Sequence, residues 1–177
     1  SGAGSYVSYV GGLMGKNNSV TLTACYATGS VSGHDYVGGL VGNNESGTLT
    51  SCYATGSVSG TGNHVGGLVG VNSGNISDCY STGTVSSSSS SWNIGGLVGH
   101  HSGSISNCYS TGAVSGYSQV GGLVGINNSG SISDCYSTGS VSCINYVGGL
   151  VGWNNPGIIT ASFWDTQTSG QDRKSVV

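Results

Sequence analysis

The first residues that could do chemistry are cysteines that recur at nearly constant spacing, each followed by tyrosine. Five belong to the series, and Cys143 stands outside it; the five are Cys25, Cys52, Cys79, Cys108 and Cys135. If equivalent residues stack about 4.8 Å apart, their Cα atoms fall within disulfide range, but their Cβ atoms must approach to about 3.8 Å. In-register parallel neighbours do not reach that distance without distortion. We therefore favour buried free thiols acting as small apolar groups, with disulfides as the alternative. One column also lacks the converging ligands of a zinc site.

Carboxylates could support hydrolysis if two of them lay close together. Asp78 and Asp134 occupy equivalent positions two repeats apart, with Asn107 between them, so stacking separates them by roughly 10 Å. Glycoside hydrolysis uses two carboxyl groups about 5–9.5 Å apart, one of them with a raised pKa. One marginal pair without further catalytic groups is weak support for such a site. We expect no catalytic residues, no metal ligands and no cofactor, and we predict that the chain is not an enzyme.

The tyrosine that follows each cysteine forms the main candidate binding surface. These residues are Tyr26, Tyr53, Tyr80, Tyr109 and Tyr136, with Phe163 at the next equivalent position. Because side chains alternate along a strand, a tyrosine next to an inward cysteine should face outward. We favour a stacked aromatic ladder that stabilises the fold. The alternative is an aromatic strip that binds glycan or another copy of the chain.

Three further residues are candidates for contact with a ligand: Trp92, His100 and His101. They lie at or near a serine-rich insertion, residues 86–92, and insertions in repeat arrays often mark a binding face. A plain solvent-exposed loop is the interpretation we favour for this serine run.

These residues are positioned by an internal repeat. The string Gly-Gly-Leu-Val/Met-Gly begins six times, every 26 to 29 residues, at Gly11, Gly38, Gly66, Gly95, Gly121 and Gly148. A fixed period in this range is typical of solenoids, propellers or arrays. Each repeat, such as 120–146, contains short alternating segments with no helical period, which predicts three short strands and three corners.

Three strands in one repeat cannot enclose a core, but stacked coils can. We therefore predict an all-β, parallel β-solenoid (β-helix) of about six coils of 26–29 residues, right-handed because parallel crossovers almost always are. A β-propeller is the rival, but its blades need roughly 40 or more residues. Leucine or isoleucine, cysteine and valine should form inward ladders. Glycine should serve corners that need a positive φ or a tight backbone, and Asn17, Asn44, Asn72, Asn127 and Asn154 should form an asparagine ladder, with His101 replacing asparagine in one coil.

The two ends depart from the repeat. Residues 162–171 carry the bulkier Phe163 and Trp164, which we expect to cover the open end of the core, as terminal repeats of solenoids do. We expect a single domain over 1–177, with an N-terminal edge at 1–9, repeats at 10–161 and a C-terminal cap and tail at 162–177. The chain opens inside a repeat, which indicates a fragment or a processed form.

Composition excludes several classes of partner. Only 5% of the residues are charged, against roughly 25% in ordinary soluble domains, and Lys16, Arg173 and Lys174 are the only lysines and arginines. Binding to nucleic acid requires clustered cations, so we exclude it as a partner. No apolar run approaches the roughly 20 residues that cross a bilayer, so we expect no membrane insertion.

The recurrent Gly-Gly-Leu-Val-Gly-x-Asn followed by Cys-Tyr-Ala/Ser-Thr-Gly-x-Val-Ser resembles the GLUG repeat. The terminal Ser162-Phe163-Trp164-Asp165-Thr166 resembles it too, and the likeness spans residues 5–171. The resemblance implies a module of large secreted or cell-surface proteins of bacteria and archaea, including adhesin-like proteins and peptidases that cleave immunoglobulin A. In those peptidases the repeats are accessory, and the family brings no catalytic residues to this chain.

We therefore expect a non-enzymatic, extracellular structural or adhesive module of a cell-surface protein or surface fibre. Its partners would be further copies of itself, a surface glycan or a host protein. One alternative is a glycan- or ice-binding module that uses a flat Thr/Tyr face, with Thr28, Thr55, Thr82, Thr111 and Thr138 as its threonines. Another is an accessory domain of a surface peptidase.

Overall fold

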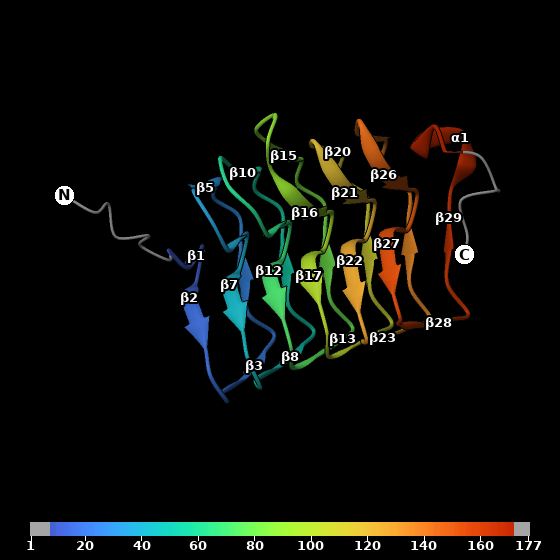
Figure 1. Ribbon diagram of the computed structural model, residues 1–177. Helices are drawn as coiled ribbons and strands as arrows, with labels where there is room; N and C mark the ends of the chain where they lie inside the picture. The colour runs from blue at the N-terminus through green and yellow to red at the C-terminus, as the bar shows by residue number, and fades with distance from the viewer. Residues whose placement is uncertain (1–7, 172–177) are drawn as a thin grey trace.

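The structure, a computed structural model, describes residues 8–171 of the chain. Six coils stack along one axis, from the N-terminal coil in blue to the C-terminal coil in red (Figure 1). Equivalent strands of successive coils pair in parallel and form five sheets. The expected all-β parallel solenoid of six coils is confirmed. Residues 1–7 of the expected N-terminal edge and 172–177 of the expected tail lie outside the described part.

Two sheets flank the Gly-Gly-Leu string. The strands before it are β1 (Val10–Gly11), β6 (Val37–Gly38), β11 (Val65–Gly66), β16 (Trp92–Gly95), β21 (Ser118–Gly121) and β26 (Asn145–Gly148). The strands after it are β2 (Met14–Asn17), β7 (Val41–Asn44), β12 (Val69–Asn72), β17 (Val98–His101), β22 (Val124–Asn128) and β27 (Val151–Asn155).

Three further sheets complete each coil. The first holds β3 (Thr21–Thr23), β8 (Thr48–Thr50), β13 (Asn75–Ser77), β18 (Ser104–Ser106), β23 (Ser131–Ser133) and β28 (Ile158–Thr160). The second holds β4 (Tyr26–Ala27), β9 (Tyr53–Ala54), β14 (Tyr80–Ser81), β19 (Tyr109–Ser110), β24 (Tyr136–Ser137) and β29 (Phe163–Trp164). The third holds β5 (Val31–Gly33), β10 (Val58–Gly60), β15 (Val85–Ser87), β20 (Val114–Ser115) and β25 (Val141–Ser142).

Each full coil therefore has five short strands rather than the expected three. The difference lies around Gly-Gly-Leu, where strands form both before and after the string. Residues 124–128 after it, for example, form β22. Glycine and asparagine are poor strand formers in isolation, but β22 pairs with β17 on one side and β27 on the other. Hydrogen bonding to both neighbouring coils outweighs the local preference.

Register is kept along the whole stack despite unequal coil lengths. Ile94 of β16 pairs with Val65 of β11 and with Val120 of β21. The extra length of this coil is absorbed between β15 and β16, at residues 88–91. Equivalent side chains therefore stack directly along the axis, which is what creates the ladders.

The interior holds two separate apolar cores. The larger core contains the Gly-Gly-Leu leucines, the following valines, the Leu/Ile column of the third strands and four buried cysteines. The smaller core contains the valines of the last strand of each coil and those that precede Gly-Gly. The glycine pair links the valine of the smaller core to the leucine of the larger core, and its backbone passes very close to the neighbouring coil. We call this point of close approach the waist.

Glycine at the waist is required for space, not for a positive φ. A Cβ added at Gly67 would lie against the carbonyl oxygen of Gly96 and the side chain of Ser81, far closer than real Cβ atoms approach. Among the described glycines only Gly170 has a positive φ. Our expectation that glycine supplies left-handed corners was wrong, whereas its use where the backbone is tight is confirmed.

The left-handed corners are occupied by other residues. One series precedes each cysteine column position and includes Ser51 (φ 54°) and Asp134 (φ 54°), and the other precedes the valine before Gly-Gly and includes His64 (φ 62°). Asp and Asn tolerate this region through local hydrogen bonds. Asp134 forms the bend between β23 and β24.

The C-terminal end of the stack closes with a helix. After β29, the chain forms α1 (Thr166–Ser169) where the earlier coils have their fifth strand. Asp165 caps its N-terminus by accepting a hydrogen bond from the Gln167 amide at 2.9 Å, and Gly170 ends it in the left-handed region. Thr168 Oγ1 donates to the carbonyl of Thr138, which attaches the helix to the preceding coil.

Candidate functional site

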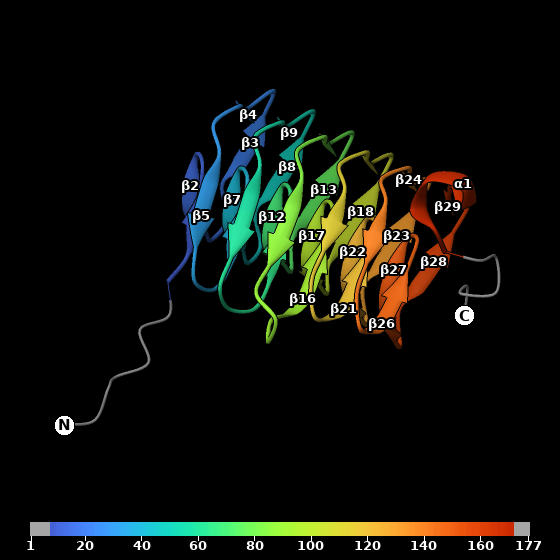
Figure 2. The same ribbon diagram turned by 90° about the horizontal axis from the view of Figure 1, so that it is seen from above.

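The tyrosine column is a continuous stacked ladder on β4, β9, β14, β19, β24 and β29, which run side by side along one face (Figure 2). Neighbouring tyrosine rings are 4.9 to 5.1 Å apart between centroids and within 6° of parallel. Phe163 continues the ladder at 5.4 Å from Tyr136. Stacking therefore covers the ring faces of the inner members and leaves mainly ring edges toward solvent.

Only the two ends of this ladder have an open ring face among the described residues. Tyr26 is 60% exposed and Phe163 is 59% exposed, whereas the tyrosines between them are half-buried. A sugar that stacks on an aromatic ring needs a ring face. The sides of the ladder are therefore poorly suited to that mode of binding.

A threonine column runs beside the tyrosine ladder. It lies two residues further along each coil, on the same outward side, and its exposed members are Thr28, Thr55, Thr82 and Thr111. The fifth member, Thr138, is half-buried and accepts the hydrogen bond from α1. The expected Thr/Tyr face therefore exists as two parallel columns.

The cysteine column consists of free thiols; Cys52, Cys79, Cys108 and Cys135 are buried and Cys25 is partly buried. Cysteine amides within the column approach the sulfur of the next coil, as in Cys52 N to Cys79 Sγ and Cys79 N to Cys108 Sγ, both at 3.3 Å. Ser162 replaces the thiol at the end of the column, with its Oγ accepting from Cys135 N at 3.1 Å. Burial raises the pKa of Cys52 to about 11, so this thiol stays protonated and is a poor nucleophile.

The asparagine ladder lies in the interior rather than at the surface. Asn44 Nδ2 donates to Asn72 Oδ1 at 2.7 Å, and Asn127 Nδ2 donates to Asn154 Oδ1 at 2.8 Å. His101 joins the ladder, with its Nδ1 facing Asn72 Nδ2 at 3.2 Å and its Nε2 facing the carbonyl of Ser131 at 3.2 Å. Nδ1 therefore accepts and Nε2 donates.

His101 is fully buried, so it cannot be part of an exposed binding surface as we had expected. Burial lowers its pKa to about 4, because the interior disfavours the charged imidazolium. Its role is to complete the ladder in a coil that lacks the usual asparagine.

His100 and Trp92 lie on other sheets than the tyrosine ladder. The half-buried His100 contacts His64, with ring centroids 5.5 Å apart. The pKa of His64 is lowered to about 4, mainly because the ring is buried and to a smaller extent because of the charge of His100. Trp92 begins β16 and is 49% exposed. The candidate residues therefore do not converge on one site.

Sequence reasoning missed a second aromatic row beside His100. Tyr9 packs edge-on against Tyr36 at 4.9 Å, and Tyr36 packs against His64 at 4.9 Å. At the other end Tyr146 stacks on Trp153 at 5.1 Å. The available signal was an aromatic or imidazole residue directly before Val-Gly-Gly in several repeats.

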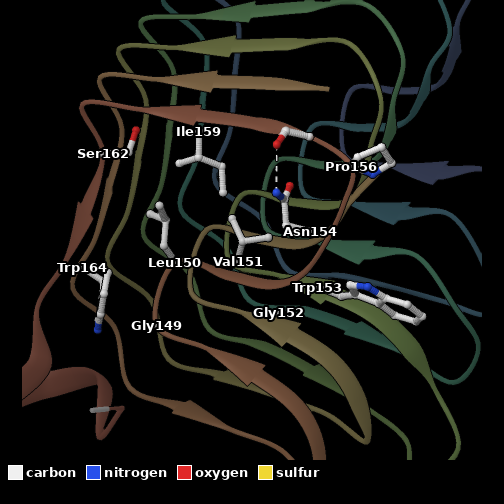
Figure 3. Close-up of a pocket in the computed structure, with 11 residues that line it drawn as sticks. Gly149, Leu150, Val151, Gly152, Trp153, Asn154, Pro156, Ile159, Ser162 and Trp164 are labelled. Carbon is white, nitrogen blue, oxygen red and sulfur yellow. Dashed lines mark hydrogen bonds between the residues drawn. The ribbon is translucent and has the colours of Figure 1, made fainter. Parts of the chain in front are cut away.

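Sequence reasoning also missed a pocket at the C-terminal end of the stack (Figure 3). Its volume is about 410 Å³, and Leu150, Val151, Ile159, Trp153 and Trp164 are among its lining residues. Figure 3 shows Trp164 beside Gly149 and Leu150 at one edge, with Trp153 on the opposite side. Trp164 partly covers the core, as expected, but the exposed Phe163 does not, because it extends the tyrosine ladder instead.

The described residues contain neither a group of three or more metal-ligand side chains nor a helix long and apolar enough to span a membrane.

Comparison with protein families explains the repeat. The family model described as the GLUG motif matches four successive stretches, residues 33–59, 61–86, 90–115 and 116–142, which together exceed half of the chain. The chain belongs to the GLUG-motif family. No curated protein and no solved structure matches it. Each GLUG match is about one coil long, so one motif corresponds to one turn of the solenoid. The first and last coils lie outside the four matches.

Proposed function

We propose that this GLUG solenoid is a non-enzymatic structural or adhesive module of an extracellular or cell-surface protein. The observation that carries the proposal is the stack itself. Six coils are joined by parallel hydrogen bonding in five sheets, and at about 4.8 Å per coil such a stack is a stiff spacer that lengthens by adding coils. We retain right-handed winding as part of this proposal, because parallel crossovers strongly prefer it.

The surface chemistry fits the same role. The chain has three lysines and arginines and six acidic residues among 177, and its exposed columns carry mainly hydroxyl groups. Such a surface has little attraction for nucleic acid or anionic lipid. We propose that its partners are a surface glycan or a host protein that meets the side of the stack.

The location can be tested on cells of the organism that makes the protein. Antibodies raised against the folded chain should label intact cells as strongly as permeabilised ones, and external protease should remove the signal. Labelling that requires permeabilisation would contradict the proposal.

The purified chain should also release no product from panels of polysaccharide and peptide substrates, with heat-denatured chain as the matched control. Turnover by the folded chain alone would refute the non-enzymatic assignment.

The adjacent Thr and Tyr columns support a second candidate, binding of glycan or ice by this face. A variant with Thr55, Thr82 and Thr111 changed to valine keeps a β-branched shape but loses the hydroxyls. Thermal hysteresis, or a glycan-array signal, that is present in the wild type and absent in this variant would support the candidate. Equal behaviour of the two proteins would exclude the threonine column as the binding surface.

A further inference from the structure

The two ends of the solenoid have complementary backbone groups. Inside the stack, Leu123 N and Val124 N donate to the carbonyl of Leu150 in the next coil at 2.9 and 3.0 Å. The equivalent donors of the last coil, Leu150 N and Val151 N, have no acceptor among residues 8–171. Leu150 and Val151 are among the residues that line the C-terminal pocket.

The N-terminal end offers the matching acceptor. Leu40 O accepts from Leu13 N at 3.0 Å and from Met14 N at 3.1 Å. Leu13 O is the equivalent acceptor of the first coil and has no donor within the described part of the chain. The Leu13 side chain is 50% exposed, whereas Leu40 is fully buried. A second copy stacked head to tail would therefore repeat the hydrogen bonding and leucine packing of the coil–coil junctions.

Val20 obstructs that stacking at the N-terminal end. It occupies a column in which the other coils have Gly47, Gly74, Gly103, Gly130 and Gly157. A Cβ at Gly74 would collide with the carbonyl oxygen of Gly47 in the preceding coil, and a Cβ at Gly157 would collide with the amide of Asn127. Val20 is tolerated, at 53% exposure, because no described coil precedes it.

Trp164 obstructs stacking at the C-terminal end. It pairs in register with Ser137, in a column of small residues. A Cβ at Gly122 would meet both the carbonyl oxygen of Gly149 in the next coil and the side chain of Ser137, whereas the three nearest neighbours of a Cβ at Gly149 all belong to the indole ring of Trp164. The indole is much larger than the serine side chain of the preceding coil, so it crowds the space beside Gly149 that the glycine carbonyl of a further coil would need.

We propose that Val20 and Trp164 act as end plugs: each side chain sterically blocks one end of the solenoid. Together they prevent a second copy of this chain from stacking head to tail on a surface that otherwise complements it. Both plugs meet at the same junction, Val20 from one copy and Trp164 from the other. Either plug is enough to block it.

Two single variants test the proposal, and neither of them should form a fibre, because each opens only one end of the solenoid. Val20→Gly opens only the N-terminal end, and Trp164→Ser, which restores the residue of the neighbouring coil, opens only the C-terminal end. Light scattering after size exclusion should give the 17.4 kDa mass of one chain for the wild type and for each variant alone. An equal mixture of the two variants should double that mass and then stop, because the outer ends remain plugged.

Val20→Ala is the matched control, because it keeps the colliding Cβ; its mixture with Trp164→Ser should keep the mass of one chain. Circular dichroism verifies that each variant is folded, and Trp164→Ala replaces Trp164→Ser if the serine variant does not fold. The proposal is overturned if the wild type alone forms head-to-tail chains, if folded Val20→Gly and Trp164→Ser or Trp164→Ala do not associate, or if Val20→Ala associates as well as Val20→Gly.

Discussion

Replacing His101 with asparagine should remove a large part of the acid sensitivity of this fold. The imidazole is fully buried, and its surroundings are the amides of Asn72 and Asn127, the carbonyl of Ser131 and the ring of His100. Protonation would place a second N–H where Nδ1 now accepts from Asn72. Asparagine is the residue that the other coils use in this column, so His101→Asn preserves the ladder while removing the titrating group.

The size of the effect follows from the pKa. Burial lowers it from 6.5 to about 4, so the unfolded chain binds a proton more readily than the folded one, and stability falls as pH falls. The contribution is fully present above pH 6.5 and is lost progressively toward pH 4. At 1.36 kcal/mol per pKa unit, the loss reaches about 3 kcal/mol once pH falls below 4, and about 2 kcal/mol at pH 5.

Urea unfolding at a series of pH values between 7.5 and 4 measures this directly, with the wild type and His101→Asn compared at each pH. The wild type should lose about 2 kcal/mol more than the variant between pH 7.5 and pH 5. His64, whose pKa is also lowered to about 4, remains in both proteins and accounts for acid sensitivity that persists. Parallel pH curves for the two proteins would refute a buried, neutral His101.

Three further predictions concern the stability of the stack, each measured by chemical denaturation. Ser81 Oγ is buried without a hydrogen-bond partner, so Ser81→Ala should stabilise the fold by about 1 kcal/mol. The matched reverse change, Ala54→Ser in the same column, should destabilise it. A loss of stability in Ser81→Ala would contradict the interpretation that this hydroxyl is unsatisfied. Gly67→Ala should destabilise the fold by roughly 3 kcal/mol or more, since its Cβ would collide with the backbone of Gly96, and a neutral effect would disprove the tight waist. Ser51→Gly should stabilise it by about 1 kcal/mol, because Ser51 has a φ of 54°, and no gain would show that this corner carries little strain.

Individual columns show how far sequence patterns reach. The spacing of the Cys-Tyr pairs was enough to place Tyr80 directly between Tyr53 and Tyr109, because parallel in-register stacking preserves a repeat along the axis. The spacing could not show that the rings cover one another's faces and leave their edges toward solvent, since that depends on the orientation of the rings. The same limit applies to His101, which has a polar side chain next to the half-buried His100 and Ser102, yet is fully buried and hydrogen-bonded to neighbouring coils.

The sequence by itself determined the period, the parallel stacked architecture, the columns and the family, because all of these follow from which residue types recur at which spacing. The tertiary structure alone decided the five-strand coil, the two cores and the function of the waist glycines. These depend on how closely the backbone of one coil approaches the next. The only sign of that distance in the sequence is the recurring glycine itself. It also decided the character of the ends: Val20 and Trp164 differ from their columns in the sequence, but their effect as obstructions follows only from the space that a neighbouring coil would need.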